Sequence, residues 1–203
     1  MTWWKRLLWV GCLCLALLLY VLPMLVQYVV KIYEFPRLWT ILLVIFLIFI
    51  TSMVFIILAK KSGILSQSGK AFQKGDGKRI ILGFLGMILV SFLGTFLLNL
   101  IHGEETTVNQ ASIIEEFQRG DMILLPITLG ILAPIAEEII FRGIIPLKIF
   151  KGYEGWGYIM GGLIFTLFHG PTNIMSFVIY GGSSVILTWL IALVDWKSVL
   201  QCT

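Results

Sequence analysis

Three apolar runs that are long enough to cross a lipid bilayer constrain the fold of this chain more than any other feature. Residues 7–30, 38–59 and 80–101 contain no charged side chain, and a transmembrane helix needs about 20 consecutive apolar residues. The composition agrees, because 59% of the 203 residues are hydrophobic and 13% are charged, whereas a soluble domain is about half apolar and a quarter charged. The chain is therefore expected to be an all-α, polytopic membrane protein.

Three further apolar segments follow in the second half of the chain. They are 122–150, 156–168 and 174–194. The second contains Gly157-x-x-x-Gly161, a spacing that predicts a face of close helix contact. The expected fold is thus a bundle of about six transmembrane helices. The first of these segments is longer than one span requires, so we expect a tilted or broken helix, with breaks at its prolines. These are Pro126, Pro134 and Pro146. Residues 102–121 are expected to form a loop with a short amphipathic turn, and residues 195–198 a turn before another helix.

Basic residues are distributed unequally among the loops, and short loops rich in Lys and Arg remain in the cytoplasm. With a cytoplasmic N-terminus, eleven of the fifteen basic residues lie inside, three lie outside, and Arg142 lies in the membrane. The eleven are Lys5, Arg6, Lys60, Lys61, Lys70, Lys74, Lys78, Arg79, Lys148, Lys151 and Lys197. We therefore expect a multi-pass protein of the cell membrane with both termini in the cytoplasm. No basic stripe typical of nucleic-acid binding is present.

The fourth apolar segment contains three ionisable residues, Glu137, Glu138 and Arg142. They lie within a stretch of about one and a half helical turns. A charge at the bilayer centre costs about 2.5–3.5 kcal/mol, so such residues normally face the bundle interior and have a function. Glu138 and Arg142 are four residues apart and can pair on one helical face, whereas Glu137 lies about 100° further round. One carboxylate can thus be neutralised by the arginine while the other stays available as a general base for water.

His169 is the expected partner of these carboxylates. If the chain turns near Tyr153, Glu138 lies fifteen residues before the turn and His169 sixteen after it. At about 1.5 Å per residue, both reach nearly the same depth in antiparallel helices. Either Glu137 or Glu138 can then face His169 and hold a water directly, or through a metal such as Zn2+. The alternative is a purely structural Glu138–Arg142 pair with a histidine that caps its helix, which a membrane setting disfavours.

These residues resemble two motifs of the CPBP family of intramembrane proteases. This family, also called Abi, includes CAAX prenyl endopeptidases and the bacteriocin-processing and bacteriocin-immunity proteins. The motifs are Glu137-Glu138-x-x-x-Arg142 and Phe165-x-x-x-His169. The resemblance divides the chain into two parts. Residues 1–121 form three membrane helices that carry no motif of the family, and residues 122–203 form the CPBP-like core.

The resemblance implies hydrolysis of a peptide bond by water that Glu137 and His169 activate, with Glu138 and Arg142 positioning the site. The implied partners are the lipid bilayer and a substrate that is a peptide or a membrane-associated protein. Members of the family have been described both as zinc proteases and as enzymes without an obligatory metal. The implied ligands of a Zn2+ ion are Glu137, Glu138 and His169.

The third motif of the family, a histidine with an asparagine or aspartate four residues on, has no match in this sequence. No histidine follows His169, and Cys202 falls about where that histidine is expected. The CPBP-like core is therefore expected to be C-terminally incomplete. A catalytically inactive immunity or interaction protein with the same fold is thus an alternative. A small proton-coupled transporter is a third interpretation, which the lack of inverted repeats disfavours.

Overall fold

The structure of the protein, a computed structural model, describes residues 2–67, 76–118 and 122–199. These residues are almost entirely helical and include no strand, so the predicted all-α fold is confirmed. Among the described residues, four segments are long and apolar enough to cross a membrane, and two further helices lie where the sequence predicts the fifth and sixth spans. The four are α1 (Trp3–Ile32), α2 (Arg37–Lys61), α4 (Asp76–His102) and a continuous helical segment, Leu124–Ile149, called the central segment below. The other two are α8 (Glu154–Phe168) and α9 (Ile174–Val199).

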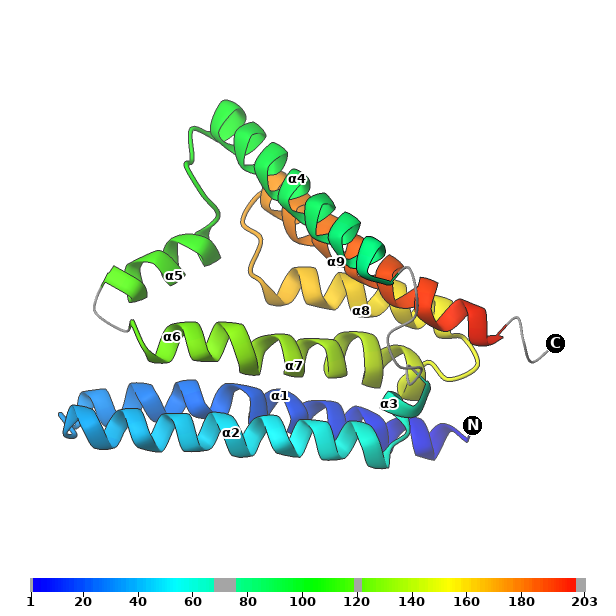
Figure 1. Cartoon of the computed structure of the whole chain (residues 1–203), viewed down its shortest axis with the longest axis horizontal. Coiled ribbons are helices and arrows are strands. Elements are labelled where there is room, and N and C mark those ends of the chain that lie inside the picture. The colour runs from blue at the N-terminus through cyan, green and yellow to red at the C-terminus, as the bar shows by residue number, and fades with distance from the viewer. Residues whose placement is uncertain (1, 68–75, 119–121, 200–203) are drawn as a thin grey trace.

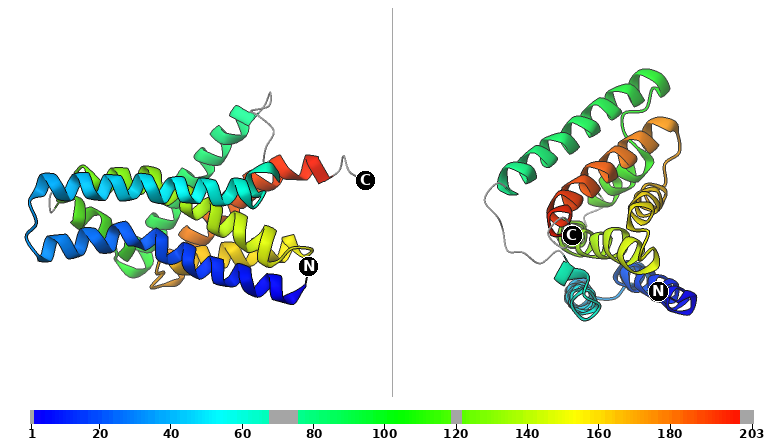
Figure 2. Two further views of the ribbon diagram at one scale, coloured as in Figure 1. Left: turned by 90° about the horizontal axis from the view of Figure 1, so that it is seen from below. Right: turned by 90° about the vertical axis from the view of Figure 1, so that its right-hand side faces the viewer.

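The helices pack in successive layers around the central segment (Figure 1). The antiparallel pair α1 and α2 covers one side of this segment, and α8 covers the other. Helix α9 packs on α8, and α4 lies against α9 on the side away from α1 and α2 (Figure 2). The central segment is accordingly the most buried of the four candidate spans. The segment that carries the three ionisable residues is therefore the core of the bundle.

The central segment changes its hydrogen-bonding pattern along its length instead of breaking. It consists of α6 (Leu124–Ile127), the π-helix η1 (Thr128–Leu132), α7 (Ala133–Glu137) and the π-helix η2 (Glu138–Ile149). Proline removes an i→i−4 hydrogen bond from a helix, and π-helical turns accommodate such gaps, frequently at functional sites. The expected breaks at the prolines are thus absent from this segment, which changes helix type instead, and one change falls between Glu137 and Glu138.

Glycines allow α8 to lie very close to the central segment. A Cβ atom at Gly157 would collide with the backbone of Pro146, and one at Gly161 would collide with the carbonyl oxygen of Phe141. Both glycines are buried, as the Gly-x-x-x-Gly spacing predicted. Because small residues at this spacing let two helix backbones approach closely, the C-terminal end of α8 is brought next to the residues that follow Glu137.

Basic side chains join the helices at the end of the bundle where α1 begins. The Arg6 guanidinium donates a hydrogen bond of 3.0 Å to the carbonyl oxygen of Lys151. The Lys148 ammonium donates one to the carbonyl oxygen of Ser62, directly after α2. Residues that the loop-charge pattern assigns to the cytoplasmic side are thus in contact with one another. The orientation of this end in a membrane stays a prediction.

Two sequence-based predictions about the connections are wrong. Residues 195–198 do not form a turn, because α9 continues to Val199 and no Gly or Pro after Gly182 interrupts it. Residues 108–118 are not a loop but an exposed helix, α5 (Val108–Gln118). Its N-terminus is capped by Thr107, whose hydroxyl accepts a hydrogen bond of 3.3 Å from the backbone N–H of Gln110. This Thr-x-x-Gln sequence is a helix-start signal.

Candidate active site

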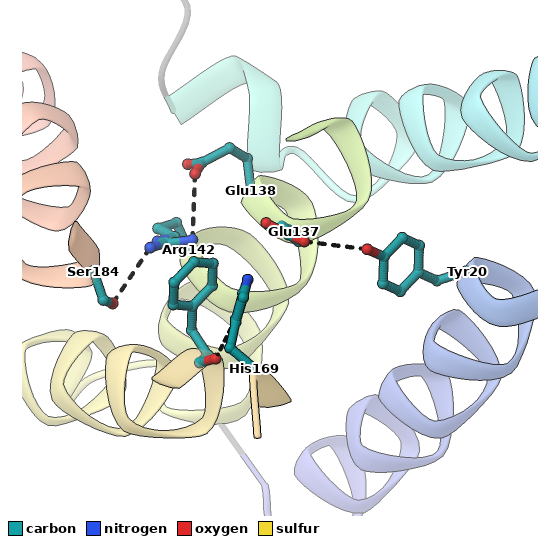
Figure 3. Close-up of polar contacts among 7 residues, drawn as sticks. Tyr20, Glu137, Glu138, Arg142, His169 and Ser184 are labelled. Carbon is teal, nitrogen blue, oxygen red and sulfur yellow. Dashed lines mark hydrogen bonds and ion pairs between the residues drawn. The ribbon is translucent and has the colours of Figure 1, made fainter. Parts of the chain in front are cut away.

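The predicted ion pair between Glu138 and Arg142 is present on the central segment. Glu138 Oε1 lies 3.3 Å from a terminal nitrogen of Arg142, whose side chain is buried. Another guanidinium nitrogen donates a hydrogen bond of 3.3 Å to the Ser184 hydroxyl of α9, and the guanidinium carbon lies 4.3 Å from the centre of the Phe165 ring. A buried charge requires such partners, so Arg142 is held jointly by its own segment, α8 and α9 (Figure 3).

Glu137 points to a different side of the central segment and contacts α1. The hydroxyl of Tyr20 donates a hydrogen bond of 3.1 Å to Glu137 Oε1. Tyr20 is one of three buried residues of α1, together with Ala16 and Pro23, and their spacing puts them on the face that packs against the central segment. The other carboxylate oxygen, Oε2, has no hydrogen-bond partner among the residues that the structure describes. Glu137 is therefore fixed through one oxygen, with the second available.

His169 lies at the end of α8, directly before Gly170 and Pro171. Gly170 has a φ of +60°, a left-handed conformation that suits glycine and ends the helix at this depth. The His169 Nδ1 atom is 2.8 Å from the carbonyl oxygen of Phe165. Because a carbonyl oxygen can only accept a hydrogen bond, Nδ1 carries the proton and Nε2 remains as the basic nitrogen. The ring also stacks on Tyr180 of α9, with 4.8 Å between ring centres.

Of the two carboxylates, it is Glu137 that lies on the side of His169. The imidazole rises from the end of α8 toward Glu137, while Glu138 turns to Arg142 and away from the histidine (Figure 3). Glu137 is within electrostatic reach of both His169 and Arg142. The structure thus brings together all four residues predicted from the sequence, and it separates them into a Glu137–His169 pair and a Glu138–Arg142 pair.

The described residues do not fit the implied zinc site. Among the side chains that the structure describes, no three of His, Cys, Asp or Glu gather as metal ligands. Glu138 is engaged by Arg142, and Tyr20 takes one oxygen of Glu137, so the set of Glu137, Glu138 and His169 does not converge on one tetrahedral position. The mechanism below therefore uses no metal. Cys202 lies outside the described residues.

Three residues at the site were missed by the sequence reasoning: Tyr20, Tyr180 and Ser184. Each is a polar side chain within an apolar helix, and such residues commonly face the interior of a membrane bundle. This signal marks them as candidates. It does not say which partner each one meets, because that depends on how α1 and α9 are rotated against the central segment.

The fold and the site define a class of protein: a helical membrane bundle with a Glu–Arg–His cluster between its helices, in which the arginine is buried. Residues 119–200 match the family model described as type II CAAX prenyl endopeptidase Rce1-like. This segment contains all four residues that carry the CPBP motifs, so the match agrees with the resemblance noted from those motifs.

One curated relative adds to this match. The UPF0177 protein YvdC of Lactococcus lactis subsp. lactis (strain IL1403) is 35% identical over 114 residues, which are 56% of this chain and 43% of that protein. The matched part thus spans less than half the length of that relative. No solved structure matches the chain significantly.

Proposed function

We propose that this protein is an intramembrane endopeptidase in which Glu137 and His169 activate a water molecule. The observation that carries the proposal is the arrangement of these two side chains. They come from different helices and lie on the same side of the central segment, and each keeps one basic atom free of the hydrogen bonds described above. The match of residues 119–200 to a family of prenyl endopeptidases supports the same reaction class.

The reaction needs a base for water and a partner that orients it. Glu137 Oε2 takes one proton from the water as the water oxygen attacks the carbonyl carbon of the scissile peptide bond. His169 Nε2 accepts a hydrogen bond from the other hydrogen and so aligns the nucleophile. When the C–N bond of the tetrahedral intermediate breaks, the proton passes from Glu137 to the leaving nitrogen. The carboxylate is then regenerated, and the products are a carboxylic acid and an amine.

The Glu138–Arg142 pair contributes to this reaction through charge and position. The guanidinium is buried and lies within electrostatic reach of Glu137. A fixed positive charge in a water-poor site favours the anionic intermediate more strongly than the neutral substrate. Glu138 and Ser184 hold that charge in place. We therefore assign Glu138 and Arg142 to positioning and electrostatics, and not to proton transfer.

The substrate proposed for this site is a polypeptide that is itself anchored in the membrane. All four site residues lie among helices that are long and apolar enough to span a bilayer, or on a helix packed against one. A scissile bond must reach that depth, and a hydrophobic or lipidated segment is the kind of substrate that partitions there. Processing of a bacteriocin, or immunity to one, is a specific form of this function that stays a prediction.

The test uses the full chain reconstituted in liposomes and internally quenched peptides that carry a farnesylated cysteine near their C-terminus. Glu137→Gln keeps the side-chain shape and an oxygen that can accept from Tyr20, but it removes the base. We expect the cleavage rate to fall by about 10²- to 10⁴-fold. Glu105→Gln, in the exposed loop before α5, is the matched control and should cleave at the wild-type rate.

The same pair of variants separates the proposal from its alternatives. If Glu137→Gln and the wild type cleave equally, Glu137 is not the base and the proposal is wrong. If neither cleaves any peptide, yet Glu137→Gln still protects cells from a bacteriocin, the inactive immunity protein is the better account. Substrate-dependent proton flux into the same liposomes would favour the transporter.

A further inference from the structure

We infer that Tyr20 is a positioning residue for Glu137, so that the first helix supplies a part of the active site. This inference rests on the proposed function, because it concerns the same reaction. It adds a residue from α1, far from the segment 119–200 that matches the protease family. The contact that carries it is the hydrogen bond of 3.1 Å from the Tyr20 hydroxyl to Glu137 Oε1.

The surroundings of Tyr20 are unusual for α1. Most side chains of this helix are exposed on the surface of the bundle, where lipid would surround them, whereas Tyr20 is 5% exposed. Ala16 and Pro23 are the other buried residues of the helix, and neither has a hydrogen-bonding side chain. A phenylalanine would fill the same space as Tyr20. Packing alone therefore does not require the Tyr20 hydroxyl.

The hydrogen bond limits the rotation of the Glu137 carboxylate. The last side-chain torsion angle of a glutamate has a broad and roughly two-fold distribution. A carboxylate without a hydrogen-bond donor therefore exchanges the positions of its two oxygens readily. A donor held on Oε1 fixes the plane of the group and leaves Oε2 for the water. A hydrogen bond to a charged group in a low-dielectric interior is also stronger than one in water. Tyr20 thus keeps the base in a reactive pose before the substrate arrives.

Tyr20 also contacts the helix that carries the histidine. The centre of its ring lies 5.9 Å from that of Phe168, the residue immediately before His169. One side chain of α1 therefore touches the carboxylate through its hydroxyl and the end of α8 through its ring. This double contact indicates that α1 sets the relative position of Glu137 and His169.

The experiment compares Tyr20→Phe with Tyr28→Phe, a tyrosine of the same helix that is 65% exposed. With the farnesylated peptides in liposomes, we expect Tyr20→Phe to lower kcat by about 10- to 100-fold. KM and the midpoint of thermal unfolding should stay close to the wild-type values. Tyr28→Phe should change none of the three. An unchanged kcat in Tyr20→Phe would overturn the inference.

A double variant separates positioning from a general effect on folding. If Tyr20 acts through Glu137, adding Tyr20→Phe to Glu137→Gln should not reduce the residual rate further. If the two losses multiply, Tyr20 acts independently and the inference is wrong. Full activity of Glu137→Gln would instead refute the proposed function, and the inference with it. Loss in Glu137→Gln without loss in Tyr20→Phe would refute the inference alone.

Discussion

Gly161 offers a direct test of the close contact between α8 and the central segment. A Cβ atom at this position would lie well inside van der Waals contact of the Phe141 carbonyl oxygen, and a backbone atom cannot rotate away. Gly161→Ala therefore requires the two helices to separate by on the order of 1 Å. Gly155 is the matched control, because it lies on the same helix and a Cβ atom there meets nothing within 4 Å.

The two substitutions should differ in their effect on stability. Replacing glycine by alanine within a helix gains up to about 1 kcal/mol of helix propensity, so Gly155→Ala should raise the unfolding midpoint slightly. At Gly161 overpacking costs about 1–3 kcal/mol, which offsets that gain or exceeds it. At about 2–4 °C per kcal/mol for a chain of this size, we expect Gly161→Ala to unfold several degrees below Gly155→Ala in the same detergent.

Activity should respond more strongly than stability. His169 lies on α8 two helical turns beyond Gly161, and a displacement of about 1 Å in a catalytic group can cost on the order of 100-fold in rate. We therefore expect Gly161→Ala to cleave the farnesylated peptide about 100-fold more slowly, with Gly155→Ala unchanged. If both variants gain stability and retain full activity, α8 is not in close contact with Phe141 and the geometry argued for Glu137 and His169 is wrong.

Three further predictions concern the surroundings of the catalytic pair. Arg142→Met should lower the free energy of unfolding by about 1–3 kcal/mol. This is less than for a fully buried ion pair, because the Glu138 side chain is 40% exposed. A denaturation midpoint equal to that of the wild type would contradict this prediction. Tyr180→Leu should reduce kcat several-fold, because it removes the ring that stacks on His169. Tyr180→Phe keeps the ring and should reduce kcat much less. Equal reductions in kcat would show that stacking is not the cause. Dialysis against a chelator should leave the cleavage rate within about twofold of the rate before dialysis, since the mechanism uses protein side chains alone. A loss of cleavage that added Zn2+ restores would refute that mechanism.

Local sequence spacing predicted much of the geometry of the candidate site. Glu138 and Arg142 pair because residues four apart share a helical face whatever surrounds them. His169 reaches the depth of Glu137 because helical rise is regular, so counting residues from the turn was sufficient. The close contact of α8 likewise followed from the spacing of its glycines. Each of these inferences depends on one helix or on one hairpin.

Two predictions about the connections were wrong, because they needed more than local spacing. The turn expected at 195–198 rested on a cluster of polar residues, but without Gly or Pro the helix continues through them. The capping sequence at Thr107 was overlooked, and with it helix α5. The implied zinc ligands share a region of the chain, but the rotation of the central segment turns Glu138 away from His169.

The sequence by itself determined that this protein is a helical membrane bundle and that Glu137, Glu138, Arg142 and His169 lie at about the same depth in it. Hydrophobic runs and fixed helical spacing are sufficient for this, because they act within single helices. Only the tertiary structure decided that Glu137, and not Glu138, lies beside the histidine. It alone brought Tyr20 from α1 to Glu137 and Ser184 from α9 to Arg142. The physical reason is that contacts between helices depend on their relative rotation, which no single stretch of sequence encodes.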